Sequence, residues 1–189
     1  MHKSYDLVFV SSNKNKYKEA KEILAQFNIR LGFLKFSAVE IQSHSIGQIA
    51  KQKALDAYKK CRFAVIVEDD GLFVNSLKGF PGPYSSYVFK TIGNAGIVNL
   101  VKMKKNADFV SVIAFCDHNK KPILFEGKTR GRISAKPKGR GWGYDPIFIP
   151  NGKNKTYAEM SEKNTVSHRY DALKKFASWF SDRRQSSDR

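Results

Sequence analysis

Residues 108–117 constrain the fold most, because apolar side chains occupy both faces of this segment. Val112 and Ala114 alternate with Ile113 and Phe115, which is the period-two pattern of a strand. A strand that is apolar on both sides belongs in the interior of a sheet that is covered on both faces. The sequence therefore predicts an α/β protein in which this strand lies centrally.

The composition indicates a folded protein with anionic partners. The chain has 189 residues, of which 41% are hydrophobic and 13% aromatic, so it is long enough to bury a core. Its formal charge of +17 favours nucleic acid, nucleotides or an anionic membrane surface. We expect one two-lobed domain over residues 1–180 and a basic, disordered tail over residues 181–189.

The sequence favours a cytoplasmic location. No apolar run approaches the roughly 18 residues of a membrane span, and residues 1–6 lack the apolar core of a signal peptide. Cys61 and Cys116 lie far apart and have no metal-site spacing, which predicts two free thiols in a reducing compartment.

An apolar run at residues 63–67 is followed directly by Glu68, Asp69 and Asp70. The pattern predicts a strand that ends at the acids, with a further strand over residues 71–74. Adjacent carboxylates repel one another unless a cation compensates them, and Mg²⁺ is usually held by carboxylates and substrate phosphates. The segment therefore predicts a magnesium site, with a solvated acidic turn as the alternative.

A short strand at residues 7–10 leads through Ser11, Ser12 and Asn13 into an amphipathic helix. A helix N-terminus offers free backbone N–H groups and the positive end of the dipole to an anion. Further positive charge comes from Lys14 and Lys16 on either side of Asn15. We predict a phosphate site here; the alternative is an ordinary capped helix with surface lysines.

Glu40 lies between Val39 and Ile41, and Lys53 lies at the edge of the apolar face of a helix that begins after Ser45. Each has a plain structural explanation. The glutamate fits a solvent-facing strand position, and a lysine at such an edge usually extends toward water.

Two segments near the C-terminus favour a planar, anionic ligand. Residues 137–150 combine three glycines with Trp142 and Tyr144, whose flat faces suit a nucleobase, although a mobile basic loop is the alternative. His168 and Arg169 occupy the first turn of the last helix, where cations oppose the helix dipole. Such a misplaced cationic pair suits an anionic or purine ligand.

The remaining segments are less informative. Residues 29–36 predict a strand, and residues 84–103 predict two helical pieces broken near Gly93. Residues 123–126 and 129–134 predict two short strands that form a hairpin or a bulged pair through Gly127.

Four motifs in this order resemble the inosine-triphosphate pyrophosphatases, a family that removes non-standard purine nucleoside triphosphates. The resemblance runs from about residue 7 to residue 180. The segment GPYSSYVFKTIG is most similar to that of archaeal members. The motifs are SSNKNK with Glu19 at residues 11–19, VEDDGL with GFPGPYSSY at residues 67–87, GWGYDPIF at residues 141–148, and TYAEM with KNTVSHR at residues 156–169.

The resemblance implies hydrolysis of inosine, deoxyinosine and xanthosine triphosphates to the monophosphate and pyrophosphate, with Mg²⁺ required. It implies an elongated, mixed, twisted sheet with helices on its faces, an active cleft between two lobes, and a homodimer. Glu40 and Glu68 would hold the metal, and Asp69 would be the general base and share the metal. The triphosphate would be bound by Ser11, Ser12, Asn13, Lys14, Asn15, Lys16 and Lys53. The purine would be enclosed by Trp142, Gly143, Tyr144, Asp145, Lys163, His168 and Arg169.

The chain departs from the family pattern at several positions. Trp142 replaces a phenylalanine, Ser12 replaces a glycine, and Asp70 stands where many relatives carry Ser or Thr, so the roles of the three adjacent acids stay open. Two other functions remain alternatives: a nucleic-acid-binding basic protein, and a Maf-like pyrophosphatase that acts on modified pyrimidine triphosphates.

Overall fold

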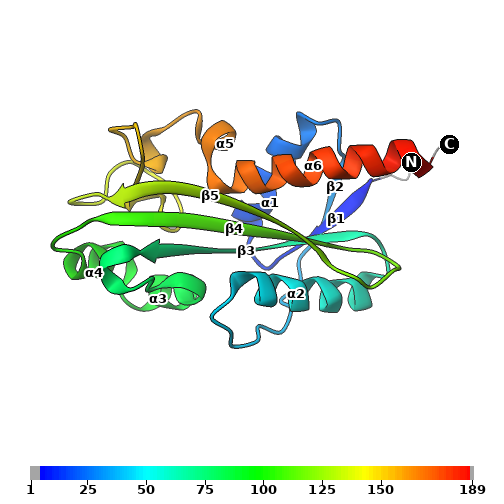
Figure 1. Cartoon of the computed structure of the whole chain (residues 1–189), viewed down its shortest axis with the longest axis horizontal. Coiled ribbons are helices and arrows are strands. Elements are labelled where there is room, and N and C mark those ends of the chain that lie inside the picture. Colours follow the sequence, from blue (N-terminus) through cyan, green and yellow to red (C-terminus); the bar gives the residue numbers. More distant parts are fainter. Residues whose placement is uncertain (1–4, 188–189) are drawn as a thin grey trace.

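The computed structural model describes residues 5–187 and contains one six-stranded sheet in the order β2-β1-β3-β4-β5-β6. The strands are β1 (Leu7–Val10), β2 (Leu31–Leu34), β3 (Val65–Val74), β4 (Asn106–Cys116), β5 (Ile123–Ile133) and β6 (Phe148–Pro150). Strand β1 runs parallel to β2 and β3, whereas β3, β4, β5 and β6 pair antiparallel. The sheet is therefore mixed, and its long strands β3, β4 and β5 twist along the length of the molecule (Figure 1).

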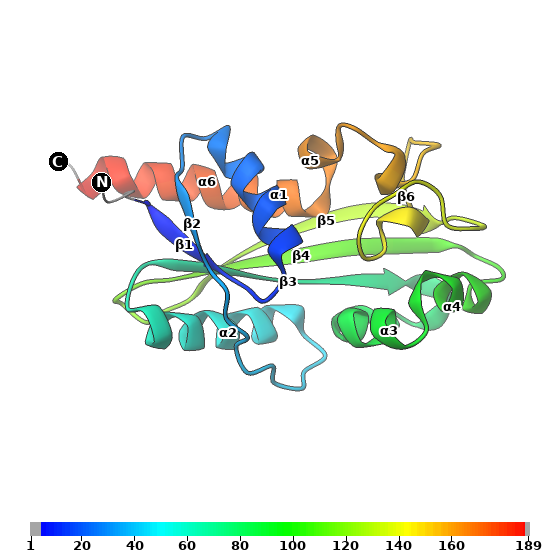
Figure 2. The ribbon, with the colours of Figure 1, turned by 180° about the vertical axis from the view of Figure 1, so that it is seen from behind.

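Helices cover both faces of the sheet. Helices α1 (Lys14–Ala25), α5 (Lys163–Val166) and α6 (His168–Ser187) lie on one face. Helices α2 (Ile46–Cys61), α3 (Ser85–Thr91) and α4 (Gly93–Leu100) lie on the other (Figures 1 and 2). Short 3₁₀ turns occupy Asn75–Leu77, Gly82–Tyr84, Asp145–Ile147 and Tyr157–Glu159. No helix of residues 5–187 is both long enough and apolar enough to cross a membrane.

Strand β4 has the central position that its alternating pattern predicts. Ile113 and Phe115 pack into a core cluster with Phe176 of α6. On the opposite face, Val112 and Ala114 pack into a second cluster that includes the alanines of α2. The prediction of a strand covered on both sides is therefore confirmed.

Two strand predictions are wrong. β3 does not end at the acids but continues through them, because β4 pairs with all ten of its residues from Val65 to Val74. β5 is one unbroken strand rather than a hairpin or a bulged pair through Gly127, which lies opposite Ser111 of β4. A Cβ atom at Gly127 would lie 2.1 Å from the His168 carbonyl oxygen, so this glycine serves the close approach of α6 instead of a turn.

The expected disordered tail is also wrong over most of its length. Helix α6 continues to Ser187, because two arginines of its last turns bond to acids far away in the sequence. Arg183 donates to Asp117 and Arg184 pairs with Asp6 at 3.3 Å. The last two residues of the tail, 188–189, lie outside the described part. The predicted break near Gly93 is confirmed, since α3 ends at Thr91 and Gly93 has a φ of +61°.

Candidate active site

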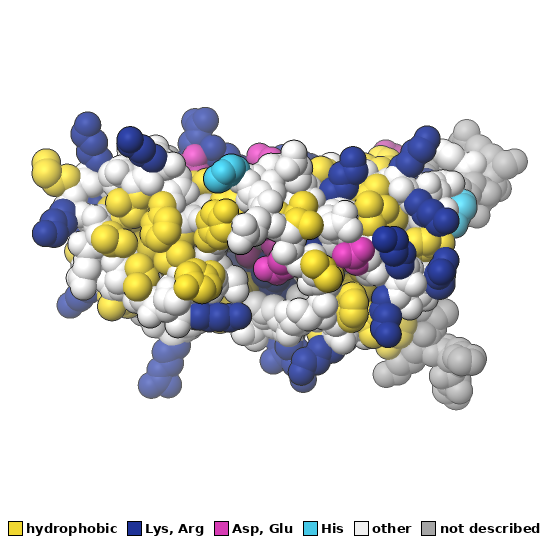
Figure 3. Space-filling view, turned by 90° about the horizontal axis from the view of Figure 1, so that it is seen from below, with side chains coloured by type: hydrophobic (Ala, Val, Ile, Leu, Met, Phe, Trp, Pro, Cys, Tyr) yellow, Lys and Arg dark blue, Asp and Glu magenta, His cyan; other side chains and the backbone are white. Residues whose placement is uncertain are grey.

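The candidate active site is a cavity of about 380 Å³ beside the open edge of β3. β1 pairs with β3 only at Val65 and Ile66 and then turns away, so the edge of β3 is unpaired by β1 from Val67 onward. Figure 3 shows acidic side chains in a hollow near the middle of the face that α2, α3 and α4 cover. Segments far apart in the sequence meet at this opening.

Most of the predicted site residues line this cavity. They are Ser11, Ser12, Asn13, Asn15, Lys16, Glu40, Lys53, Glu68, Asp69, Trp142, Gly143, Tyr144, Asp145, His168 and Arg169. Two predicted residues do not line it. Lys14 is exposed on the first turn of α1, and Lys163 lies buried behind the cavity wall, where it contacts Asp145.

The cavity also has a wall that the sequence motifs did not assign. Ser85, Ser86, Phe89 and Lys90 of α3 line it, together with Phe109 of β4. The GFPGPYSSY motif precedes and enters α3, so the motif itself was the available signal for this wall.

The phosphate side of the cavity is built on the first turn of α1. Asn13 caps the helix, since its side-chain oxygen accepts from the Asn15 backbone N–H at 2.9 Å. Ser11 Oγ accepts from the Asn13 backbone N–H at 3.0 Å. The helix dipole and the nearby Lys16 therefore give this end of the cavity a positive potential.

Neighbouring acids of β3 point to opposite faces of the sheet, because successive side chains of a strand alternate between its two faces. Asp69 faces α2, where its Oδ1 accepts from Lys53 at 2.7 Å. Asp70 faces α1, where its Oδ1 accepts from Lys16 at 2.8 Å. Burial raises the pKa of Asp69, which Lys53 and Lys16 only partly offset. Burial also acts to raise the pKa of Asp70, but Lys16 and Arg169 hold it well below the usual value.

Arg169 is the buried hub of the site, with a side chain only 1% exposed. Its Nε donates to both carboxylate oxygens of Glu68, at 2.8 and 2.9 Å, and its other nitrogens donate to Asp70 and Glu19. Glu68 also accepts from Ser111 Oγ at 2.8 Å. These acids compensate the cation that the sequence places unfavourably in the first turn of α6.

His168 is not a cation in this environment, which corrects the expected cationic pair. Its ring stacks on Phe109 with centroids 4.0 Å apart, and neither ring nitrogen has a partner among the described residues. Burial lowers the pKa of His168 well below its ordinary value, and Arg169 lowers it further. The imidazole is therefore neutral at physiological pH.

Glu19 organises the side of the cavity that suits a base. Its carboxylate accepts from Trp142 Nε1 at 2.7 Å and from Lys163 Nζ at 2.8 Å, and also pairs with Arg169. Lys163 in turn donates to Asp145 Oδ2 at 2.6 Å. The Arg169 guanidinium lies 5.1 Å from the centre of the Trp142 ring, within reach of a cation–π interaction. The aromatic loop and the two cations thus form one connected wall.

The carboxylates predicted to hold a metal are only partly brought together. Glu40 and Asp69 lie on either side of Lys53, whereas Glu68 turns to Arg169 and Ser111. No group of three or more His, Cys, Asp or Glu side chains within residues 5–187 is arranged to hold a metal ion as the structure stands.

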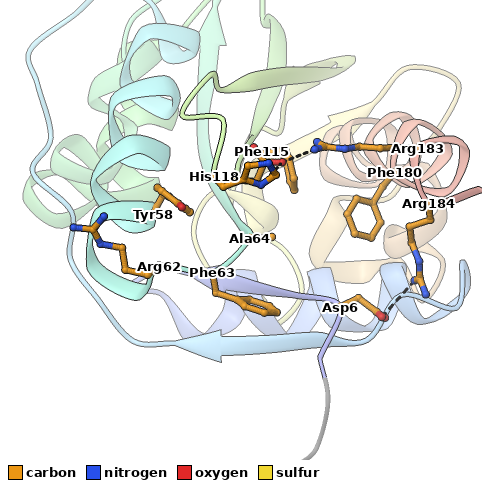
Figure 4. Close-up of a pocket in the computed structure, with 11 residues that line it drawn as sticks. Asp6, Tyr58, Arg62, Phe63, Ala64, Phe115, His118, Phe180, Arg183 and Arg184 are labelled. Atoms are coloured by element: carbon orange, nitrogen blue, oxygen red, sulfur yellow. Dashed lines mark hydrogen bonds and ion pairs between the residues drawn. The ribbon is translucent and has the colours of Figure 1, made fainter. Parts of the chain in front are cut away.

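A second cavity, of about 420 Å³, lies between the C-terminal end of α2, the last turns of α6 and the residues after β4 (Figure 4). Its wall includes the ion pairs of Arg183 with Asp117 and of Arg184 with Asp6. None of the predicted site residues lines it.

The chain is similar to known proteins over most of its length. The Ham1 family model matches residues 7–179. The chain is 46% identical to the dITP/XTP pyrophosphatase of Methanopyrus kandleri over 92% of this chain and 95% of the relative. It is 45% identical to that of Hyperthermus butylicus over 92% and 93% of the two chains. Among solved structures, a HAM1 protein from Coxiella burnetii matches with a TM-score of 0.79 at 29% identity, over 93% of this chain and 98% of that one.

Proposed function

Since the chain belongs to the Ham1 family, we propose that it hydrolyses deoxyinosine, inosine and xanthosine triphosphates to the monophosphate and pyrophosphate. The observation that carries the proposal is one cavity that joins a phosphate-binding helix start, the acids of β3 and a base-binding wall. The relatives named dITP/XTP pyrophosphatase cover almost the whole chain, which supports the same substrate class.

We propose Asp69 as the general base. A water oxygen attacks the α-phosphorus, the bond from that phosphorus to the bridging oxygen breaks, and pyrophosphate leaves. The water proton passes to Asp69, whose carboxylate lies in the cavity at the open edge of β3. Lys16, Lys53 and the first turn of α1 supply the positive charge that a transferring phosphoryl group needs.

Mg²⁺ fits the acidic part of the cavity. Asp69 Oδ2 is buried and has no hydrogen-bond partner among the described residues, and Glu40 lies close by through Lys53. Carboxylate oxygens are the ligands that Mg²⁺ prefers, usually together with substrate phosphates. Glu40 and Asp69 would hold the ion, whereas both oxygens of Glu68 accept from Arg169. When bound, the ion supplies charge neutralisation for the phosphates and the attacking water.

We propose that Asp145 and neutral His168, which line the cavity, read the 6-oxo edge of the purine, and that Lys163 positions Asp145 from behind the cavity wall. An N–H donor pairs with O6 of hypoxanthine, but it meets an amino group when adenine binds and is then left unpaired. A site built in this way rejects the wrong base strongly, by ~10⁴-fold or more.

Lys163→Ala is expected to narrow the preference for deoxyinosine over deoxyadenosine triphosphate by at least about tenfold, because Asp145 loses the buried charged donor that holds it in place. The comparison is the ratio of kcat/KM for the two nucleotides. Lys153→Ala is the matched control, since Lys153 is an exposed lysine whose ammonium pairs with Glu162 at 3.5 Å. An unchanged ratio in Lys163→Ala would reject its role in base reading.

We also propose that the protein is a homodimer formed through the face of α3 and α4. This face exposes a group of large apolar side chains: Phe80, Tyr84, Tyr87, Phe89, Ile92, Leu100 and Met103. Figure 3 shows yellow side chains gathered over this end of the molecule. Exposed apolar patches of this kind mark association surfaces.

In sedimentation equilibrium, we expect a dimer for the wild type. We expect a monomer for Tyr87→Lys, because this tyrosine is 70% exposed on the proposed interface and the substitution places a charge there. A monomeric wild type would contradict the proposal.

A further inference from the structure

The loop of the base-binding wall is held through side chains at both of its ends. Trp142 Nε1 donates to Glu19 at 2.7 Å, and Asp145 Oδ2 accepts from Lys163 at 2.6 Å. Between these two residues, Gly143 has a φ of +60°, and a Cβ atom built on it would meet nothing within 4 Å. No packing on this side of Gly143 restrains the peptide bond that follows it.

A hydrogen bond from Asn94, in the first turn of α4, restrains this peptide instead. Asn94 Nδ2 donates to the carbonyl oxygen of Gly143 at 3.1 Å, across 49 positions of the sequence. Because a carbonyl oxygen only accepts, the side-chain amide presents its nitrogen to Gly143. Its Oδ1 is left buried, without a partner among residues 5–187. A buried oxygen without a partner lowers stability, and such a local cost is typical of a functional position.

The bond from Asn94 also determines where the next backbone donor points. The peptide between Gly143 and Tyr144 is trans, so its C=O and N–H groups lie in one plane and point in opposite directions. The Tyr144 N–H therefore points away from Asn94. Gly143 and Tyr144 line the cavity, whereas Asn94 does not. No acceptor within the described residues pairs with this N–H, which leaves it as a donor on the cavity side of the loop.

Helix α3 holds the side chain of Tyr144 separately from its backbone. The Tyr144 hydroxyl donates to the carbonyl oxygen of Ser85 at 3.0 Å, and Phe89 packs edge-on against the ring with centroids 5.5 Å apart. Tyr144 is only 4% exposed. The side chain is thus fixed without Asn94, and the bond from Asn94 acts on the orientation of the peptide.

We propose that Asn94 is a positioning residue for base recognition: it holds the Gly143 carbonyl so that the Tyr144 N–H faces the purine. The inference rests on the proposed function and adds a residue that does not line the cavity. Without the bond, the peptide can rotate, because glycine adopts positive and negative φ with similar ease. The N–H then turns away from the cavity, and the base loses one hydrogen bond while the phosphates keep theirs.

Asn94→Asp tests the proposal, because a carboxylate cannot donate to the Gly143 carbonyl. We expect its affinity for a non-hydrolysable inosine triphosphate analogue, measured by calorimetry, to fall about three- to tenfold, the usual value of one hydrogen bond. Its affinity for inorganic tripolyphosphate, which has no base, should not change, and this result also shows that the variant is folded. Asn94→Leu removes the donor without adding a charge and should lose affinity for the inosine analogue to the same extent. Asn99→Asp, at an exposed asparagine of the same helix, is the matched control and should bind both compounds like the wild type.

The outcomes separate this proposal from the proposed function. Wild-type affinity for the inosine analogue in both Asn94 variants would overturn the role of Asn94 and leave the proposed function standing. Equal losses for the analogue and for tripolyphosphate would also overturn it, because the substitution would then disturb the whole site. A wild type that binds the analogue no more tightly than tripolyphosphate would refute base recognition itself, and both proposals with it.

Discussion

Asp69→Asn is expected to lower kcat for deoxyinosine triphosphate by about 10²- to 10⁴-fold, the usual contribution of a general base. The amide has nearly the same shape as the carboxylate, and its oxygen can still accept from Lys53, but it cannot take up the proton of the attacking water. Binding of a non-hydrolysable deoxyinosine triphosphate analogue, measured by calorimetry, should change much less than kcat.

Asp108→Asn is the matched control for this variant. Asp108 lies on the neighbouring strand β4 and pairs with Lys128 away from the cavity, so its kcat should stay at the wild-type value. A rate for Asp69→Asn within a few-fold of the wild type would remove Asp69 from the role of base and direct attention to Glu68 and Asp70.

Arg169→Met is expected to lower the free energy of unfolding by about 3–5 kcal/mol, because it removes one partner from a buried ion network. Glu68 has a fully buried side chain, and with Asp70 and Glu19 it would lose its strongest donor. The measurement is urea denaturation at pH 7, monitored by tryptophan fluorescence.

Arg184→Met serves as the control for charge removal on the same helix. Arg184 is 52% exposed and pairs with Asp6, so its loss should cost at most about 1 kcal/mol. Equal losses in the two variants would show that Arg169 does not hold the acids of the site together.

The central architecture and the family were predictable from the sequence. The alternating residues of β4, such as Val112 and Ile113, determine two buried faces and hence the covered sheet. The four motifs predicted a resemblance to the inosine-triphosphate pyrophosphatases, which the Ham1 family match and the named relatives confirm. A motif preserves the order of residues along the chain, so it is visible without a structure.

The pairing of the charges was not predictable in the same way. The apolar pattern of the strand is interrupted by Glu68, Asp69 and Asp70, and this interruption predicted the end of the strand. In the structure, β4 forms strand pairs with all three acids. The structure can place them inside a strand because cations from α1, α2 and α6 reach them from both faces. Those partners lie 16 to 101 positions away in the sequence, as Lys53 does from Asp69 and Arg169 from Glu68.

The role of Glu19 and the length of α6 were missed for the same reason. Glu19 lies among charged residues of α1, so the sequence does not indicate that it is part of the site. Only the fold brings Trp142, Lys163 and Arg169 to its carboxylate. The composition of residues 181–189 favoured disorder, but Asp117 anchors the end of the helix from a distant strand turn.

Release of pyrophosphate from a panel of nucleotides tests the central claim most directly. Deoxyinosine, inosine, xanthosine, adenosine, guanosine and thymidine triphosphates should each be assayed with Mg²⁺ and with a chelator, and the products identified by phosphorus NMR. We predict rapid release of pyrophosphate and monophosphate from the first three, little from the other three, and none when the metal is chelated. Release of orthophosphate instead of pyrophosphate, or activity on none of the six nucleotides, would contradict the account.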